Sequence, residues 1–136
     1  MRGPTETVGG ALAGERILAV EDSYIVLLEI ATVLSNEGAA VTKCATIEEA
    51  LRAIDTEPFA AAVLDIRLGH ETIAPVARRL ADLGTPFIFY TGQVLSEATA
   101  QWSGIRIVSK PALAAVLVNA VAALLRSSAA ARAQGR

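Results

Sequence analysis

The chain of 136 residues has little of several features that mark whole classes of protein. It contains one cysteine, Cys44, so it can form neither an internal disulfide nor a cysteine-based zinc site. No uninterrupted apolar stretch reaches the roughly 20 residues of a membrane-spanning helix. Residues 1–10 lack the apolar segment of a secretory signal. These absences favour a soluble, cytoplasmic protein.

Basic charge and aromatic residues are also scarce. Lysine and arginine number 12 against 14 acidic residues, a net charge of −2, so no basic excess indicates nucleic-acid binding. Aromatic residues make up 4% of the chain and hydrophobic residues 53%, most of them Ala, Val, Leu and Ile. This composition suits a parallel sheet covered on both faces, whose strands read as continuous apolar runs.

Short apolar runs alternate with segments that have helical character. We predict strands at about 16–20, 40–44, 60–65, 86–90 and 105–108. Predicted helices lie at about 23–36, at about 47–55 behind a capping box of Thr46 and Glu49, between Gly69 and Gly84, at about 94–102 and at about 112–126. This alternation predicts one parallel sheet with helices on both faces. We expect one domain at 15–126, a flexible leader at 1–14 and a frayed tail at 127–136.

Four of the predicted strands end in polar or charged side chains. Glu21-Asp22 follow the first strand, Asp65 ends the third, Thr91-Gly92 end the fourth and Lys110-Pro111 follow the fifth. In an open parallel sheet, ligands bind at the edge formed by the C-terminal ends of the strands. Three carboxylates, a hydroxyl and an ammonium at this edge predict a site for magnesium and a phosphoryl group.

Each acidic residue has a predicted role in this chemistry. The carboxylate of Asp65 can attack phosphorus and carry the group as an acyl phosphate. Asp22 and Asp65 are candidate direct ligands of magnesium, which prefers one or two carboxylates together with waters and phosphate oxygens. Glu21 would act on the metal through a water molecule.

The other residues at this edge would bind the phosphoryl group itself. Lys110 would pair with one phosphate oxygen as a point charge. Thr91 would hydrogen-bond another oxygen, and Gly92 leaves room for the group to approach.

In this order and spacing, the four motifs Glu21-Asp22, Asp65, Thr91-Gly92 and Lys110-Pro111 resemble the receiver domain of two-component response regulators, over about residues 15–126. The resemblance implies a flavodoxin-like (CheY-like) fold with five parallel strands and helices on both faces. It implies that Asp65 receives a phosphoryl group from a histidine kinase or phosphotransfer protein, that Mg²⁺ is required, and that the aspartyl phosphate hydrolyses slowly. The stretch Leu64–Gly69 with Glu71, together with Pro75–Ala77 and Pro86–Gly92, is similar to small receivers common in alphaproteobacteria.

The resemblance also assigns roles to residues near the site. The backbone carbonyl of Arg67 would be a further magnesium ligand. Arg67 and Gln93, two residues beyond Asp65 and Thr91, would flank the phosphoryl group and modulate its chemistry. Receivers usually carry Tyr or Phe three residues before the lysine, where this chain has Ile107. The usual relay from threonine to an aromatic side chain is therefore in doubt, and Tyr90 or Trp102 are the candidates to replace it.

The last predicted helix is apolar on all sides apart from Asn119. We expect one face to cover the sheet, namely Leu113, Val116, Leu117, Val121 and Leu124. The opposite side has no polar stripe, which predicts a dimer or partner surface centred on Val118 and Leu125. The alternative is a small exposed face without a role.

Two other functions compete with a phosphorylated receiver. A hydrolase of the haloacid-dehalogenase type would carry a second Asp two residues after its nucleophile, where this chain has Arg67, so we expect no turnover enzyme. A pseudo-receiver would bind partners without phosphorylation, and only Ile107 favours it. Asp22 taken alone could simply cap the first helix. No output domain is recognisable after residue 126, so we expect output through binding of a downstream protein or through onward transfer of phosphate.

Overall fold

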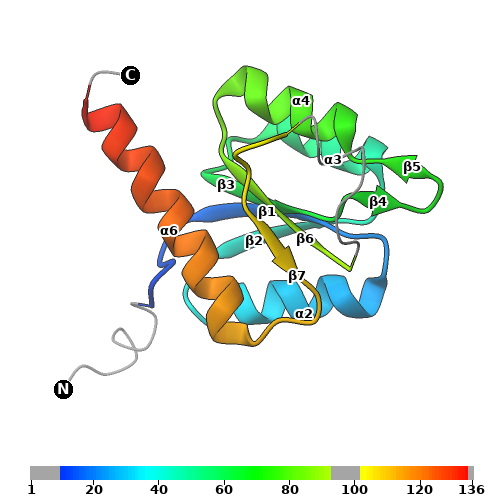
Figure 1. The fold of residues 1–136 in the computed structure, drawn as a ribbon, viewed down its shortest axis with the longest axis horizontal. Helices are drawn as coiled ribbons and strands as arrows, with labels where there is room; N and C mark the ends of the chain where they lie inside the picture. The colour runs from blue at the N-terminus through cyan, green and yellow to red at the C-terminus, as the bar shows by residue number, and fades with distance from the viewer. Residues whose placement is uncertain (1–9, 93–101, 135–136) are drawn as a thin grey trace.

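The computed structural model describes residues 10–92 and 102–134. It has a five-stranded parallel sheet in the order β2-β1-β3-β6-β7 (Figure 1). The strands are β1 (Arg16–Val20), β2 (Ala40–Cys44), β3 (Ala61–Leu64), β6 (Phe87–Thr91) and β7 (Ile107–Ser109). The predicted fold class is confirmed, and each predicted strand is present with its bounds shifted by two residues at most.

The sheet is covered on both faces by helices. These are α2 (Tyr24–Ser35), α3 (Ile47–Thr56), α4 (Ala74–Leu83) and α6 (Ala114–Ala133). Figure 1 shows α2 and α6 on one face and α3 and α4 on the other. Because side chains alternate along a strand, β1 gives Ile17 and Ala19 to the first layer of the core and Leu18 and Val20 to the second. All four side chains are fully buried.

Side-chain caps fix where two of the helices begin. The hydroxyl of Ser23 accepts from the backbone N–H of Val26 at 3.4 Å and caps α2. Thr46 caps α3 by accepting from the N–H of Glu49 at 3.1 Å. The carboxylate of Glu49 accepts from the N–H of Ala45 at 2.8 Å, one residue before the amide that a reciprocal capping box would use. The predicted start of α3 is therefore confirmed with a slightly different set of bonds.

The predicted flexible leader is wrong for residues 10–14. Leu12 is completely buried in the core, and its N–H donates to the carbonyl of Glu37 at 2.9 Å. The N–H of Gly14 donates to the carbonyl of Gly38 at 3.1 Å. Burial of the Leu12 side chain and hydrogen bonds to two backbone carbonyls just after α2 hold this segment in place. Residues 1–9 of the predicted leader lie outside the described residues.

The predicted frayed tail is wrong for residues 127–133, because α6 continues to Ala133. This segment is rich in alanine, the residue with the highest helix propensity, and Arg132 donates to the hydroxyl of Ser128 at 2.8 Å. By length and composition alone, α6 is apolar enough to cross a membrane. Its N-terminal half, however, packs in the core through buried Leu117 and Val121. The helix predicted at 94–102 falls almost entirely outside the described residues.

A short β-hairpin follows β3 and was not predicted. It pairs β4 (Arg67–Leu68) with β5 (Glu71–Thr72) in antiparallel register through the two-residue turn Gly69-His70. Gly69 has a φ of 63°. Glycine suits the first position of a two-residue hairpin turn because that position requires a positive φ. Figure 1 shows the hairpin projecting from the same edge of the sheet as the end of β3.

Candidate functional site

The register of the sheet places the predicted site residues at one edge. Val20 lies opposite Leu64, and Leu64 lies opposite Phe89, so the residues that follow β1 and β3 and the end of β6 meet there. Glu21, Asp22 and Asp65 each place a carboxylate oxygen within 4.8 Å of the other two.

A lysine from the last strand connects the buried acids. The ammonium of Lys110 hydrogen-bonds the carboxylate of Glu21 and lies 3.2 Å from Asp65 Oδ2. The backbone N–H of Lys110 donates to the carbonyl of Thr91 at 2.9 Å, which fixes the lysine beside the end of β6. The structure therefore brings Lys110 to the carboxylates, as the sequence predicts, and places Thr91 beside Lys110 at the end of β6.

Two of the three carboxylates, and the hydroxyl of Thr91, are buried, which is unusual for charged and polar groups. Glu21 is 1% exposed, Asp65 8% and Thr91 1%, whereas Asp22 is exposed. A charged group removed from water needs compensating partners. Glu21 has two, because it also accepts from the N–H of Ser23 at 3.1 Å.

The electrostatics of the site favour additional positive charge. Burial raises the pKa of Glu21 above its ordinary value, and the hydrogen bonds from Lys110 and Ser23 only partly offset this effect. Burial alone would lower the pKa of Lys110, but its hydrogen bond to Glu21 and the charge of Asp65 raise it instead. Three carboxylates and one ammonium leave a formal charge of 1 − 3 = −2.

This set of donors fits a hard divalent cation such as Mg²⁺. Magnesium is held by oxygen ligands, with one or two carboxylates from the protein and waters in the remaining positions. The carboxylates of Asp22 and Asp65 and the carbonyl of Arg67 are the candidate ligands. Glu21 is already engaged by Lys110 and Ser23, which suits an indirect role.

Asp22 is held by a contact that the sequence did not reveal. It does not cap α2, since Ser23 does, and the capping alternative is therefore wrong. Asp22 Oδ2 instead accepts from the backbone N–H of Gly69 at 2.8 Å, at the turn of the β4–β5 hairpin. The same hairpin carries Arg67, whose side chain is exposed. The signal for this contact was the Gly69-His70 turn, but strands of two residues leave no readable alternation.

Of the two aromatic residues that could replace the usual aromatic side chain at position 107, Tyr90 is the one that lies beside the site. Ile107 is 36% exposed on β7. Tyr90 is buried, its hydroxyl accepts from the N–H of Ala112 at 3.3 Å, and the ammonium of Lys110 lies 5.7 Å from its ring centroid. Trp102 instead packs edge-on against Phe87, at the far end of β6.

Gly92 and Gln93 follow Thr91, and the structure describes only the first of them. A Cβ built at Gly92 would meet no heavy atom within 4 Å, so there is open space beside this residue. Gln93 lies outside the described residues.

The predicted interface on α6 is wrong in placing Val118 at its centre. Val118 is only 9% exposed and belongs to the chain's own core, and Leu125 packs against that core as a partly buried side chain. Leu113 and Val116, which were expected to cover the sheet, are instead exposed. A helix without a polar stripe carries no pattern that sets which side faces inward. The large exposed apolar side chains of this segment, Leu113 and Val116, therefore lie at the beginning of α6.

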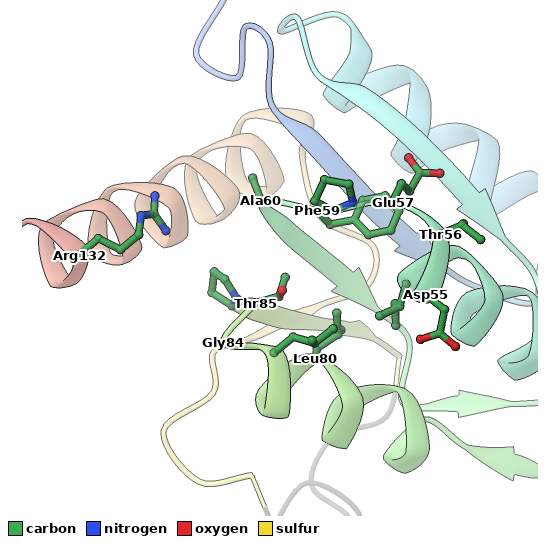
Figure 2. Close-up of a pocket in the computed structure, with 13 residues that line it drawn as sticks. Asp55, Thr56, Glu57, Phe59, Ala60, Leu80, Gly84, Thr85 and Arg132 are labelled. Atoms are coloured by element: carbon green, nitrogen blue, oxygen red, sulfur yellow. The ribbon is translucent and has the colours of Figure 1, made fainter.

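A separate cavity of about 590 Å³ opens at the opposite edge of the sheet. Figure 2 shows Phe59 and Leu80 at this cavity, together with Asp55, Glu57 and Arg132. These charged groups already have partners: Asp55 pairs with Arg79 and Glu57 with Arg16, both at 2.6 Å, and Arg132 bonds Ser128. The cavity therefore offers less reactive chemistry than the sheet edge that carries Glu21, Asp22 and Asp65, which we call the acidic edge.

Comparisons with known proteins give a consistent result at the level of structure. No family model matches the sequence, and no curated protein matches it. The chain is similar to a CheY-like response regulator receiver domain protein from Methanospirillum hungatei, with 26% identity and a TM-score of 0.77 over 84% of this chain and 95% of that one. It is also similar to the BeF3-activated DrrB receiver domain, with 25% identity and a TM-score of 0.71 over 82% and 97% of the two chains.

A larger regulator shares the fold. The response regulator PhyR from Brucella abortus is 20% identical with a TM-score of 0.78, over 97% of this chain and 56% of that one. The receiver prediction is confirmed by these likenesses. The narrower likeness to small alphaproteobacterial receivers stays a prediction.

Proposed function

Because the chain is a response regulator receiver domain in fold, we propose that Asp65 accepts a phosphoryl group in a magnesium-dependent reaction. The donor is a phosphohistidine on a histidine kinase or a phosphotransfer protein in the cytoplasm. The phosphorylated chain then signals by binding another protein or passes the group on. One observation carries this proposal: the buried carboxylate of Asp65 lies beside Glu21 and Asp22 and is contacted by Lys110 at 3.2 Å.

The residues divide the reaction between them. An Asp65 oxygen forms the new bond to phosphorus as the bond from phosphorus to the histidine nitrogen breaks, and the electron pair stays with the imidazole. Negative charge spreads over three phosphoryl oxygens in the transition state, so positioning and positive charge dominate the catalysis. Lys110 supplies a fixed ammonium to one oxygen and Thr91 donates its hydroxyl to another. Asp22, Asp65 and the Arg67 carbonyl would hold magnesium, which would supply the remaining positive charge.

Exposed apolar side chains beside the site support a protein as the phosphoryl donor. Tyr24 and Ile25, in the first turn of α2, are 67% and 71% exposed. Leu113, at the start of α6, is 77% exposed. Both helices begin just after site residues, Asp22 and Lys110. A partner that presents its histidine to Asp65 would cover these apolar groups, which favours protein contact at this edge.

The conformational response should stay close to the site. Phosphorylation would draw Lys110 and Thr91 inward and reshape the segments after β3 and β6. Ile107 lies partly exposed where an aromatic relay is usual, so we expect little change along β7. Backbone amide shifts with and without an acyl-phosphate mimic measure this response, and large shifts throughout β7 would contradict it.

The function is tested by intact mass after incubation with a small phosphodonor. We expect wild type to gain one phosphoryl group with Mg²⁺ and none with EDTA, and Asp65→Ala to gain none. If wild type stays unmodified, the same measurement is repeated with a phosphorylated histidine kinase as donor. Absence of an adduct with both donors would overturn the proposal and leave a phosphorylation-independent interaction module.

A hydrolase is the less suitable function for this site. The position two residues after Asp65, which an acid-base aspartate would occupy, holds Arg67 with its side chain exposed. We therefore propose a signalling domain that is phosphorylated once and slowly loses the group. Repeated release of phosphate from small organic phosphates, measured against Asp65→Ala, would show turnover instead.

A further inference from the structure

The β4–β5 hairpin touches the candidate metal site through one main-chain group. The N–H of Gly69 donates to Asp22 Oδ2 at 2.8 Å, across 47 residues of sequence. Asp22 is the exposed member of the acidic group, whereas Glu21 and Asp65 are held by burial and by Lys110. An exposed carboxylate would otherwise turn freely. The bond to Oδ2 therefore also sets the direction of Oδ1, the other carboxylate oxygen of Asp22.

The hairpin is attached to the core at its base, as a support for Asp22 requires. Its base is anchored by Ile66, Leu68 and Ile73, which are 2%, 6% and 2% exposed in the core. The N–H of Ile73 donates to the carbonyl of Ile66 at 2.9 Å and closes the base. Gly69 stands at the tip, and its φ of 63° is the conformation that directs the turn. Three buried side chains thus hold one N–H against one carboxylate.

We propose that the hairpin is a positioning element for magnesium, in which the Gly69 amide orients Asp22 toward the metal. This inference rests on the proposed function. Hydrogen bonds to ligating carboxylates orient them, and their loss typically costs 10- to 100-fold in metal affinity. The hairpin also carries the Arg67 carbonyl, so one small element governs two of the three candidate ligands. Gly69 and its backbone geometry therefore contribute to magnesium affinity without touching the metal.

The conformation of Gly69 permits a matched pair of variants. A Cβ at this position would meet no heavy atom within 4 Å, so backbone conformation and not space limits substitution. Asn tolerates a positive φ, whereas a β-branched residue strongly disfavours it. Gly69→Asn should keep the amide in place, and Gly69→Val should move it away from Asp22. Neither change alters a side chain that binds metal or phosphate.

The test is calorimetric titration of Mg²⁺ into wild type, Gly69→Asn and Gly69→Val without any phosphodonor. We expect Gly69→Val to bind about 10-fold or more weakly and Gly69→Asn to stay within about threefold of wild type. Equal affinity of Gly69→Val and wild type would overturn the inference and leave the proposed function intact. Failure of wild type itself to bind Mg²⁺ would overturn both.

Amide hydrogen exchange of wild type gives a result that does not depend on the folding of any variant. The Gly69 amide should be protected from exchange in the presence of EDTA, because its bond to Asp22 exists before metal binds. Its chemical shift should then move with the added Mg²⁺. Exchange as fast as in an unstructured peptide would overturn the inference.

Discussion

Replacing Lys110 by methionine should reveal how the acidic edge balances its charge. The ammonium contacts both Glu21 and Asp65, whose side chains are 2% and 11% exposed. Methionine keeps an unbranched apolar chain but removes the charge. The folded variant would hold two buried carboxylates without their shared cation, so we expect it to be less stable than wild type when no metal is present.

The expected magnitude follows from the burial of the pair. Removing one partner of a fully buried ion pair costs about 3–5 kcal/mol. The Lys110 side chain keeps 19% of its exposure, so we expect about 2–3 kcal/mol after allowing for partial solvation. With a denaturant slope of roughly 1.5–2 kcal/mol/M, this loss corresponds to a urea midpoint lower by about 1–2 M. We expect Lys110→Met to bind magnesium more tightly than wild type, because the variant lacks the positive charge that competes with the metal for the carboxylates.

Urea unfolding in EDTA and in Mg²⁺ measures both effects. The control is Lys43→Met, which makes the same substitution at an exposed position on β2. Because the pKa of Lys110 is raised above its ordinary 10.5 in the folded state, its contribution is complete below about pH 10.5 and is lost as pH rises through the folded value. Equal midpoints of Lys110→Met and wild type in EDTA at pH 7 would refute this account of the site. Magnesium affinity of Lys110→Met equal to or below wild type would refute the competition between the two cations.

Three further predictions follow from individual residues. Burial raises the pKa of Cys44 to about 11, so iodoacetamide at pH 8 should alkylate it far more slowly in the folded protein than in urea, as followed by mass; equal rates would contradict its burial. Thr46→Ala should destabilise the fold by about 1 kcal/mol through loss of the α3 cap, whereas Thr46→Ser should be nearly neutral, and thermal unfolding of both variants decides. Val118→Ala should cost roughly 2 kcal/mol in urea because Val118 lies in the core, and Leu113→Ala should cost under about 0.5 kcal/mol because Leu113 is exposed; the reverse order would contradict the observed orientation of α6.

The sequence predicted well the features that depend on contrast between neighbouring residues. β1 has the predicted bounds because its apolar run Ile17–Val20 lies between the charged residues Arg16 and Glu21. The same contrast located the site, since Asp65 and Lys110 stand where apolar strands stop. Parallel register then brings these ends together whatever the details of the loops. The acidic edge could thus be assembled from one sequence.

The predictions that failed concern segments in which apolar and polar residues do not alternate clearly. In α6 every side is apolar, so Val118 and Leu113 could not be assigned to inside and outside from the pattern. Leu12 is one apolar residue in a Gly-rich segment, and only its contacts with the end of α2 reveal that it is buried. The β4–β5 hairpin has strands of two residues, too short for alternation to be visible. Gly69 was therefore recognised as a loop residue, but its bond to Asp22 was not.

The acidic edge departs from the rules that hold for the rest of the core. Val20 and Leu64 are buried apolar residues that stabilise the sheet, yet the residues directly after them are the buried acids Glu21 and Asp65. Lys110 offsets one of the three negative charges, and burial still raises the pKa of Glu21. Such local conflicts with folding rules are expected at functional sites. The conflict here is electrostatic and has a definite sign, so a bound divalent cation removes it. Magnesium should therefore stabilise the fold well beyond the effect of a monovalent salt at equal ionic strength, because it would bind at the edge and not merely screen it.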